Sequence, residues 1–322
     1  MISAPISVGT PAMYVGFFAA VVVMIAIDMF ALNKAGNHKV SVKEALSWTV
    51  VWVTVAMLFN GWLWWHLASD PNIGRDIANH KALEFLTGYV LEKSLAVDNI
   101  FVFLMIFSFF KVPPEYQRRV LVYGVLGAVI MRAIMISIGA VLVQEFHWIL
   151  YIFGAFLVFT GLKMMMPEKE SDDDLANNPL LKWLRGHIRV TPEFHQEKFF
   201  IRDSSGWIAT PMLLVLIMIE FSDLIFAVDS IPAIFAVTTD PFIVMTSNIF
   251  AILGLRAMYF LLADVADRFH LLKYGLAAVL TFIGAKMLMV EFYKMPIAVS
   301  LGVVFFFLTA SVVASLIVTK KH

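Results

Sequence analysis

Nine long apolar segments constrain the fold of this chain more than any other feature of its sequence. A membrane-spanning helix needs about 20 mainly apolar residues. Windows close to that length lie at residues 11–32, 45–67, 82–109, 119–143, 148–166, 209–235, 242–263, 272–290 and 296–318. The chain is 61% hydrophobic and 15% charged, whereas soluble domains average about 25% charged residues. We therefore predict an all-α, polytopic membrane helix bundle of about nine transmembrane helices, forming a single integral membrane domain over residues 1–322.

Basic residues outside these windows indicate how the helices are oriented. If the amino terminus lies outside the cytoplasm, sixteen Lys and Arg residues fall on the cytoplasmic side and three on the outer side. Cytoplasmic loops of membrane proteins carry the excess of Lys and Arg. The pattern therefore predicts an outer amino terminus, a cytoplasmic carboxyl terminus and a cytoplasmic loop at residues 167–208.

Three short motifs occur twice in the same order. They are EKSLAVDNI (92–100) and DLIFAVDSI (223–231), MRAIM (131–135) and LRAMY (255–259), and FTGLKMMM (159–166) and FIGAKMLM (282–289), at offsets of 131, 124 and 123 residues. Each copy contains three predicted spans, an odd number, so the two copies must enter the membrane from opposite sides. This predicts two inverted three-helix repeats, about 82–166 and 209–290. Many transporters use such repeats to build a binding site near the middle of the membrane.

Acidic residues lie inside the predicted spans, where they are costly. They are Asp28, Glu92, Asp98, Glu220, Asp223 and Asp229. A charged side chain at the bilayer centre costs about 2.5–3.5 kcal/mol on insertion scales, so such residues face a bundle interior and mark partners or pathways. Asp28 is close to the cytoplasmic end of the first span, and a structural role is favoured for it. The other acids lie on the repeats and are candidates for carrying an ion.

Basic residues accompany these acids within the spans. They are Lys93, Arg132, Lys163, Arg256 and Lys286. Lys163 and Lys286 lie toward span ends and are expected to extend to the membrane surface. Arg132 and Arg256 lie in the middle of their spans, where they either neutralise acids in structural ion pairs or take part in function, and the same choice stays open for Lys93. Acids remain in excess even if both arginines are paired, so the interior favours a cation or protons.

Polar groups close to the acids in the sequence indicate which cation is favoured. They are Ser94, Asn99, Ser222, Ser230, Ser247 and Asn248, and the chain has no cysteine. Oxygen-rich sites suit Mn²⁺, Mg²⁺ or Ca²⁺ rather than Cu⁺ or Zn²⁺. The predicted metal ligands are Glu92, Asp98, Asp223 and Asp229. The predicted auxiliary residues are Asp28, Asn99, Ser230 and Asn248.

Helical geometry predicts how four of the acids share an ion. Residues six positions apart on a helix differ by about 9 Å in height and about 120° in direction. Glu92 and Asp98 are therefore not expected to bind one ion together, and the same holds for Asp223 and Asp229. Because the two helices run antiparallel, we predict an outer layer of Glu92 with Asp229 and an inner layer of Asp98 with Asp223.

Several segments resemble the TerC family of bacterial integral membrane proteins, and its Alx branch most closely. Among them are EKSLAVDNIFVFLMIF (92–107) and AVDSIPAIFAVTTDPFIV (227–244), and the resemblance covers nearly the whole chain, least clearly the loop at 167–207. The resemblance implies a manganese exporter of the bacterial inner membrane. It also implies that the acids at the matching positions, Glu92, Asp98, Glu220, Asp223 and Asp229, carry the ion.

The expected mechanism is exchange of a metal ion for protons, because carboxylates crowded in a low dielectric cannot all stay ionised without a cation. The expected partners are a divalent metal ion, protons and the lipid bilayer. We expect no enzyme activity and no cofactor, and the net charge of +0 gives no indication of nucleic acid. Two alternatives stay open. An intramembrane aspartyl protease would also need two buried aspartates, but AVDN and AVDS lack the Tyr-Asp and Gly-x-Gly-Asp signatures. A membrane scaffold would explain the ion pairs and nothing else.

Overall fold

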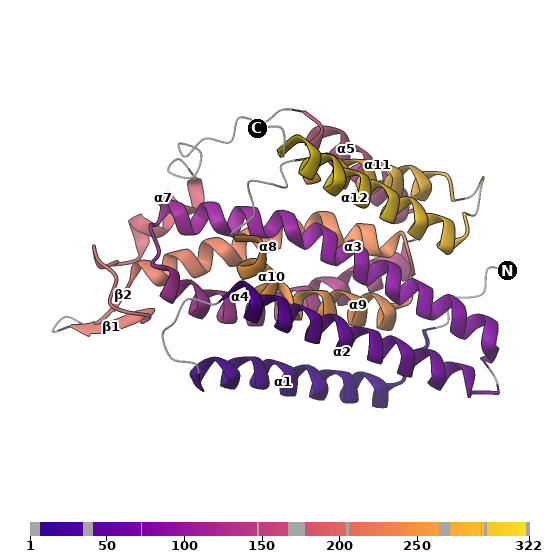
Figure 1. Cartoon of the computed structure of the whole chain (residues 1–322), viewed down its shortest axis with the longest axis horizontal. Coiled ribbons are helices and arrows are strands. Elements are labelled where there is room, and N and C mark those ends of the chain that lie inside the picture. The colour runs from indigo at the N-terminus through magenta and orange to yellow at the C-terminus, as the bar shows by residue number, and fades with distance from the viewer. Residues whose placement is uncertain are drawn as a thin grey trace.

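The chain folds into a bundle of long helices (Figure 1). The computed structural model describes residues 7–34, 41–71, 73–146, 148–166, 178–203, 206–263, 271–290, 292 and 295–319. The helices in these ranges are α1 Pro11–Lys34, α2 Val42–Ala68, α3 Gly74–Phe109, α4 Pro114–Glu145, α5 Ile149–Met164, α7 Pro179–His187, α8 Pro211–Phe235, α9 Pro241–Leu253, α10 Leu255–Ala263, α11 Leu272–Leu288 and α12 Ile297–Thr319. Several of them begin at a proline, whose missing N–H would be unpaired at a helix start in any case.

The nine predicted windows all fall on helices, which confirms the all-α membrane fold. By length and composition, α1, α2, α4, α8 and α12 are each apolar enough to cross a membrane. The window at 242–263 is divided into α9 and α10, which bend by 42° at Gly254, and this pair counts as a sixth candidate span if it is taken as one. α5 is apolar but short, and the 36-residue α3 carries charged residues along its length.

The predicted loop at 167–208 contains a short helix and a β-hairpin. The basic segment LLKWLRGHIRV (180–190) favours a helix there, whereas the hairpin was not expected from the sequence. Helix α7 begins after Asn178, whose side-chain oxygen accepts a hydrogen bond from the backbone N–H of Leu180 at 2.9 Å. Two short strands, β1 Phe200–Asp203 and β2 Gly206–Ala209, pair antiparallel. This small hairpin is the only sheet in the described ranges, and residues 167–177 of the loop lie outside them.

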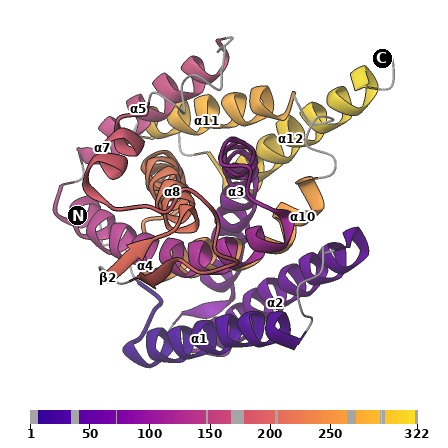
Figure 2. The ribbon, with the colours of Figure 1, turned by 90° about the vertical axis from the view of Figure 1, so that its left-hand side faces the viewer.

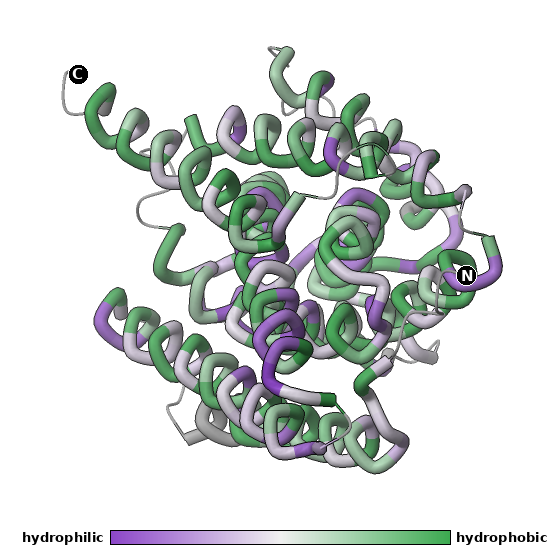
Figure 3. Tube along the Cα trace, turned by 90° about the vertical axis from the view of Figure 1, so that its right-hand side faces the viewer, coloured by the Kyte–Doolittle hydropathy of each residue, from purple (hydrophilic) through white to green (hydrophobic). Residues whose placement is uncertain are grey.

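The helices form three groups. Helices α1 and α2 lie on one flank, α5, α11 and α12 lie on the opposite flank, and α3, α4, α8 and α9 lie between them (Figures 1 and 2). Hydrophilic positions are interspersed along the central helices, whereas α12 is almost entirely hydrophobic (Figure 3). Apolar side chains point outward from the flanks, among them Val15 at 72% exposed and Phe306 at 67% exposed. Such a surface is suited to contact with lipid tails.

Helices α5 and α11 pack with their backbones in close contact. A Cβ atom added at Gly161 would lie 2.7 Å from the carbonyl oxygen of Ala277, and one added at Gly284 would lie 2.6 Å from the carbonyl oxygen of Gly154. Small residues at such a crossing allow close van der Waals packing, which drives helix association in membranes. This contact joins α5 and α11 into one unit of the flank.

Candidate functional site

Arg132 of α4 lies at the centre of the bundle, with its side chain 1% exposed. Its guanidinium forms an ion pair with Glu92 of α3. It binds Asp223 of α8 through both Nη2 and Nε, at 3.1 Å to Oδ1 and 3.3 Å to Oδ2. Nη1 also donates to Oγ of Ser230 at 3.0 Å. One arginine therefore joins the first acids of the two repeated motifs.

Two buried amides complete the hydrogen bonding of these carboxylates. Asn99 of α3 donates from Nδ2 to Oδ1 of Asp223 at 3.1 Å, and Asn248 of α9 donates from Nδ2 to Oε2 of Glu92 at 3.0 Å. Oδ1 of Asn248 has no hydrogen-bond partner within the described ranges. We call these residues the central cluster: Glu92, Asn99, Arg132, Asp223, Ser230 and Asn248. Each of the four central helices contributes at least one of them.

The charges of the central cluster do not balance when both acids are ionised. Glu92 and Asp223 then carry two negative charges, against one positive charge on Arg132. Removing charges from water costs several kcal/mol per ion, and a buried pair offsets that cost only when its geometry and remaining hydrogen bonds are favourable. The planar guanidinium meets this requirement because its donors point in several fixed directions at once. The cluster is therefore well bonded and still one positive charge short.

The predicted two-layer arrangement of the acids is wrong. Glu92 and Asp223, the equivalent members of the two motifs, meet at Arg132. The two predicted layers require α3 and α8 to cross midway between the two acids of each motif. In the structure, the helices instead bring Glu92 and Asp223 to the same height. Asp229 instead accepts a hydrogen bond at 3.3 Å from Thr160 of α5. Asp98 is half-buried on α3, six positions along from Glu92 and so on a different face.

Glu220 lies close to the central cluster without joining it. It is half-buried on α8, just under one turn before Asp223. Its carboxylate rests against Gly127 of α4, where any added Cβ would collide with it. Within the described part of the chain, no ion pair involves Glu220. It therefore adds a further acid beside the two that Arg132 binds.

Lys93 binds a helix end rather than an acid. Its Nζ donates to the carbonyl oxygen of Ala251 at 3.0 Å, beside Gly254, where α9 ends and α10 begins. An ammonium group at this position interacts favourably with the partial negative charge of the α9 carboxyl end. Lys93 was predicted to pair with a charge, and its bond in the described structure is instead to a backbone carbonyl at the helix break.

The second mid-span arginine has a different partner from the first. Nη2 of Arg256 on α10 lies 2.5 Å from Oδ1 of Asp28 on α1. Both side chains are buried, and Nη1 of Arg256 has no hydrogen-bond partner within the described residues. Arg132 and Arg256 occupy equivalent positions in the repeated motifs, yet only Arg132 reaches the central acids. The structural role predicted for Asp28 agrees with this pairing.

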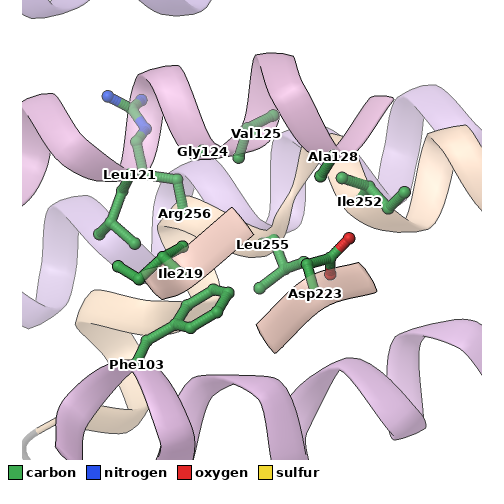
Figure 4. Close-up of a pocket in the computed structure, with 10 residues that line it drawn as sticks. All are labelled: Phe103, Leu121, Gly124, Val125, Ala128, Ile219, Asp223, Ile252, Leu255 and Arg256. Carbon is green, nitrogen blue, oxygen red and sulfur yellow. The ribbon is translucent and has the colours of Figure 1, made fainter. Parts of the chain in front are cut away.

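A cavity of about 20 Å³ lies between the central cluster and Arg256. Its lining includes Gly124 and Ala128 of α4, Ile219 and Asp223 of α8, and Arg256 of α10. Figure 4 shows the Asp223 carboxylate at one side and the Arg256 guanidinium at the other, directed away from it. A volume of roughly 10–15 Å³ or more accommodates a water molecule where polar partners are present. Apart from Asp223 and Arg256 the lining is apolar, and both carboxylate oxygens of Asp223 already bind Arg132 or Asn99.

Metal-binding capacity is limited in this arrangement. Among the described residues, no group of three or more His, Asp or Glu side chains lies close enough together to hold a metal ion. The four acids predicted as ligands are therefore not assembled around one point. The strongest pair of candidate ligands, Glu92 and Asp223, is occupied by the guanidinium of Arg132.

A second charged cluster was not predicted from the sequence. Lys81 lies 2.9 Å from Oε2 of Glu84 and 3.3 Å from Oδ2 of Asp240, and Thr238 donates to Glu84 at 2.6 Å. Asp240 also accepts from the backbone N–H of Val8 and of Phe242, at 3.0 and 3.1 Å. The signal in the sequence is the Asp-Pro pair at 240–241, which is typical of a capping residue before the first turn of a helix.

Comparison with known proteins places the chain among membrane proteins of bacteria. Residues 77–322 match the family described as "Integral membrane protein TerC family". Proteins called "Putative membrane-bound redox modulator Alx" are similar in Salmonella typhi, at 59% identity over 95% of this chain and 94% of theirs, and in Escherichia coli (strain K12), at 57% over 98% of both. An "Uncharacterized membrane protein" of Rickettsia bellii (strain RML369-C) is 38% identical over 94% of this chain and 96% of its own. No solved structure matches. The family match covers most of the chain and the relatives nearly all of it, so this protein belongs to the TerC family of integral membrane proteins.

Proposed function

We propose that this protein is a membrane transporter that exports a divalent metal ion, with Mn²⁺ the favoured ion, through its buried carboxylates. The observation that carries the proposal is the central cluster, in which Glu92 and Asp223 are buried together with a single arginine. An interior that holds more acid than base attracts a cation. Ionisable residues at such depth in a membrane protein mark ion pathways more often than they mark packing.

The packing of the two repeats supports a transporter architecture. The 123-residue offset between the third motifs relates Gly161 to Gly284 and Gly154 to Ala277. The close contacts obey this relation, because Gly161 faces Ala277 while Gly284 faces Gly154. A contact in which each partner meets the equivalent of the other is the mark of two-fold symmetry. Inverted repeats related in this way place their substrate site near the middle of the membrane.

The choice of ion follows from the oxygen atoms around Asp223 and from the family. The carboxylate oxygens and the hydroxyl oxygen of Ser230 favour Mn²⁺, Mg²⁺ or Ca²⁺, whereas Asn99 presents its amide nitrogen to Asp223. Membership of the TerC family favours Mn²⁺ among them. The name redox modulator belongs to the relatives. The 322-residue sequence has no cysteine, so its own side chains offer no thiol–disulfide pair for such a role.

Orientation and coupling complete the proposal. The excess of Lys and Arg on one side supports an inner-membrane protein with an outer amino terminus and a cytoplasmic carboxyl terminus. Carboxylates that are not bound to Arg132 need either a metal ion or protons to balance their charge in the low dielectric. This requirement fits export of a metal ion in exchange for protons. Among the alternatives, a protease is disfavoured because an aspartyl dyad shares a proton between two facing acids. Here Glu92 and Asp223 each bind a guanidinium instead.

Reconstitution into proteoliposomes tests the function. Wild-type protein should move Mn²⁺ across the bilayer, while Glu92→Gln and Asp223→Asn should insert normally and move it at least about tenfold more slowly. Glu115→Gln, on the exposed first turn of α4, serves as the matched control and should transport like wild type. Normal transport by both cluster variants at normal abundance would show that the acids are structural. Transport that ignores a pH gradient would remove the proton coupling and leave export intact.

A further inference from the structure

The β-hairpin at one end of the bundle exposes aromatic side chains on one of its faces. In an antiparallel pair, residues two positions apart on a strand share a face, and so do residues directly opposite each other. Arg202 of β1 pairs with Trp207 of β2, so Phe200, Arg202 and Trp207 lie on the same side of the hairpin. Phe200 is 50% exposed, Trp207 is 72% exposed, and Arg202 is exposed as well. We call these three residues the outer hairpin face.

The other face of the hairpin is better covered. It carries Ile201 opposite Ile208, and both isoleucines are half-buried. The larger apolar side chains of the hairpin are therefore the ones that point away from the protein. Exposed aromatic rings that are grouped on one face mark interaction sites. The outer hairpin face is for this reason a candidate contact surface.

The hairpin is attached where two candidate membrane spans begin. Strand β2 ends at Ala209, two residues before α8 begins at Pro211. Phe199, directly before β1, packs edge-on against Tyr123 of α4 with ring centroids 5.2 Å apart. At a rise of about 1.5 Å per residue, Tyr123 lies about 14 Å along α4 from its start at Pro114. The base of the hairpin is therefore level with the ends of these spans, at the boundary between membrane and water.

Helix α7 is joined to the hairpin and adds another exposed ring. The backbone N–H of Ala209 donates to the carbonyl of Arg189, two residues beyond α7, at 3.0 Å. Leu181 and Leu184 fix α7 to the core at 0% and 3% exposed, whereas Trp183 is 56% exposed. The helix and the hairpin lie at the same end of the bundle (Figures 1 and 2). This end of the molecule thus presents aromatic rings and cationic side chains together.

The chemistry of the outer hairpin face fits lipid headgroups. Tryptophan is enriched at the level of the headgroups, where its ring contacts the apolar region and its N–H stays hydrated. Arg202 is the only charged residue on this face, and a guanidinium binds phosphate through two parallel hydrogen bonds. A membrane surface that contains anionic lipids is negative and attracts Lys and Arg. The face is therefore complementary in both polarity and charge to an anionic phospholipid.

We propose that the outer hairpin face docks onto the membrane surface and binds the headgroup of an anionic phospholipid. Arg202 contacts the phosphate, while Trp207 and Phe200 enter the headgroup region beside it. The docking fixes the segment that leads into α8 against the lipid surface. No residue of the central cluster takes part, so this inference goes beyond the proposed function and does not depend on it.

A spin label on the hairpin tests the docking, because the sequence has no native cysteine. Phe200→Cys leaves Arg202 and Trp207 in place, and the purified full-length protein is labelled and reconstituted into vesicles of phosphatidylcholine alone or with added phosphatidylglycerol. With phosphatidylglycerol, the label should collide more often with molecular oxygen and less often with a water-soluble nickel complex. Glu193→Cys, at an exposed position outside the hairpin, is the matched control and should stay accessible to the nickel complex in both kinds of vesicle.

Arg202→Gln, made in the labelled Phe200→Cys protein, tests the role of charge. One Lys or Arg near an anionic surface contributes about 1 kcal/mol, so the ratio of docked to free hairpin should fall about fivefold in the vesicles with phosphatidylglycerol. The ratio should not change in phosphatidylcholine alone. High salt should reduce the docking of the parent protein in the same way. Arg75→Gln removes an exposed charge at the start of α3 and should have no effect.

Each other outcome overturns the proposal. A label that the nickel complex reaches in both kinds of vesicle would show that the hairpin does not dock. Equal protection in both would show that anionic headgroups are not selected, and so would Arg202→Gln that docks like its parent. Protection that comes with spin–spin broadening between labels would show that a second copy of the chain covers the face. None of these spectra depends on Mn²⁺ transport, so the docking and the proposed function fail or succeed separately.

Discussion

The ion pair between Arg256 and Asp28 offers the sharpest test of how the two mid-span arginines differ. Nη2 and Oδ1 lie 2.5 Å apart, and the side chains are only 6% and 10% exposed. Asp28 lies on α1, outside both predicted repeats, so the bond joins the first helix to the bundle core. We expect Arg256→Gln to destabilise the protein, because it leaves the Asp28 carboxylate buried without its partner.

The size of the effect follows from this burial. Removing one member of a buried pair typically costs about 3–5 kcal/mol, whereas replacing both members is often neutral or stabilising. Here Nη1 of Arg256 already lacks a partner within the described residues, so the pair is incompletely satisfied and its net contribution is small. Arg256→Gln alone should therefore lose about 3 kcal/mol, and the double variant Asp28→Asn with Arg256→Gln should regain most of that loss.

The measurement is a double-mutant cycle on the midpoint of denaturation in detergent, with protein abundance in the membrane as a second readout. Arg75→Gln, an exposed position at the start of α3, is the matched control and should change neither. Mn²⁺ transport by the stable double variant should stay near the wild-type rate, since this pair lies outside the central cluster. A double variant no more stable than Arg256→Gln, or one that folds and has lost transport, would refute the structural assignment.

Three further predictions concern the packing and the acids. Gly161→Ala should destabilise the protein by about 1–3 kcal/mol through overpacking, because the added Cβ would lie 2.7 Å from a backbone oxygen. Gly302→Ala is the control, since its added Cβ would meet no atom within 4 Å. The denaturation midpoints of the two variants are compared with that of the wild type. Asp240→Ala removes the cap of α9 and should lower the free energy of unfolding by about 0.5–2 kcal/mol. It should also make the amino terminus more sensitive to limited proteolysis, because Asp240 binds the backbone of Val8. An unchanged cleavage rate would contradict this prediction. Glu92→Cys combined with Asp223→Cys should be bridged by Cd²⁺, which is measured as blocked thiol labelling; full labelling in the presence of Cd²⁺ would contradict the meeting of these positions.

The helices were largely predictable because they depend on local properties of the chain. A long apolar run in a membrane has no alternative to an internally hydrogen-bonded helix, and for this reason all nine windows coincide with helical segments. The bend of 42° at Gly254 was not predictable in the same way. Beside the bend, the carbonyl of Ala251 binds Lys93, a residue 158 positions away in the sequence.

The candidate site was predictable only in part, because Glu92 and Asp223 meet at Arg132, whereas Asp229, predicted as a ligand beside Glu92, bonds to Thr160. The cost of burying charge is enough to single out Glu92, Asp223 and Arg132 from the sequence. Which acids meet depends on where α3 and α8 cross. A shift of the crossing point by a few residues along the helices would bring a different pair of acids together. The two-layer prediction failed for that reason.

The sequence by itself determined that this is an integral membrane protein and that charged residues lie within its apolar segments, because both properties follow from composition and from the order of residues along the chain. The two inverted repeats stay a prediction. Only the tertiary structure decided which groups touch. Equivalent arginines found different partners, Arg132 the central acids and Arg256 the first helix. Such differences arise because a contact depends on the relative placement of two helices, and no single stretch of sequence encodes that placement.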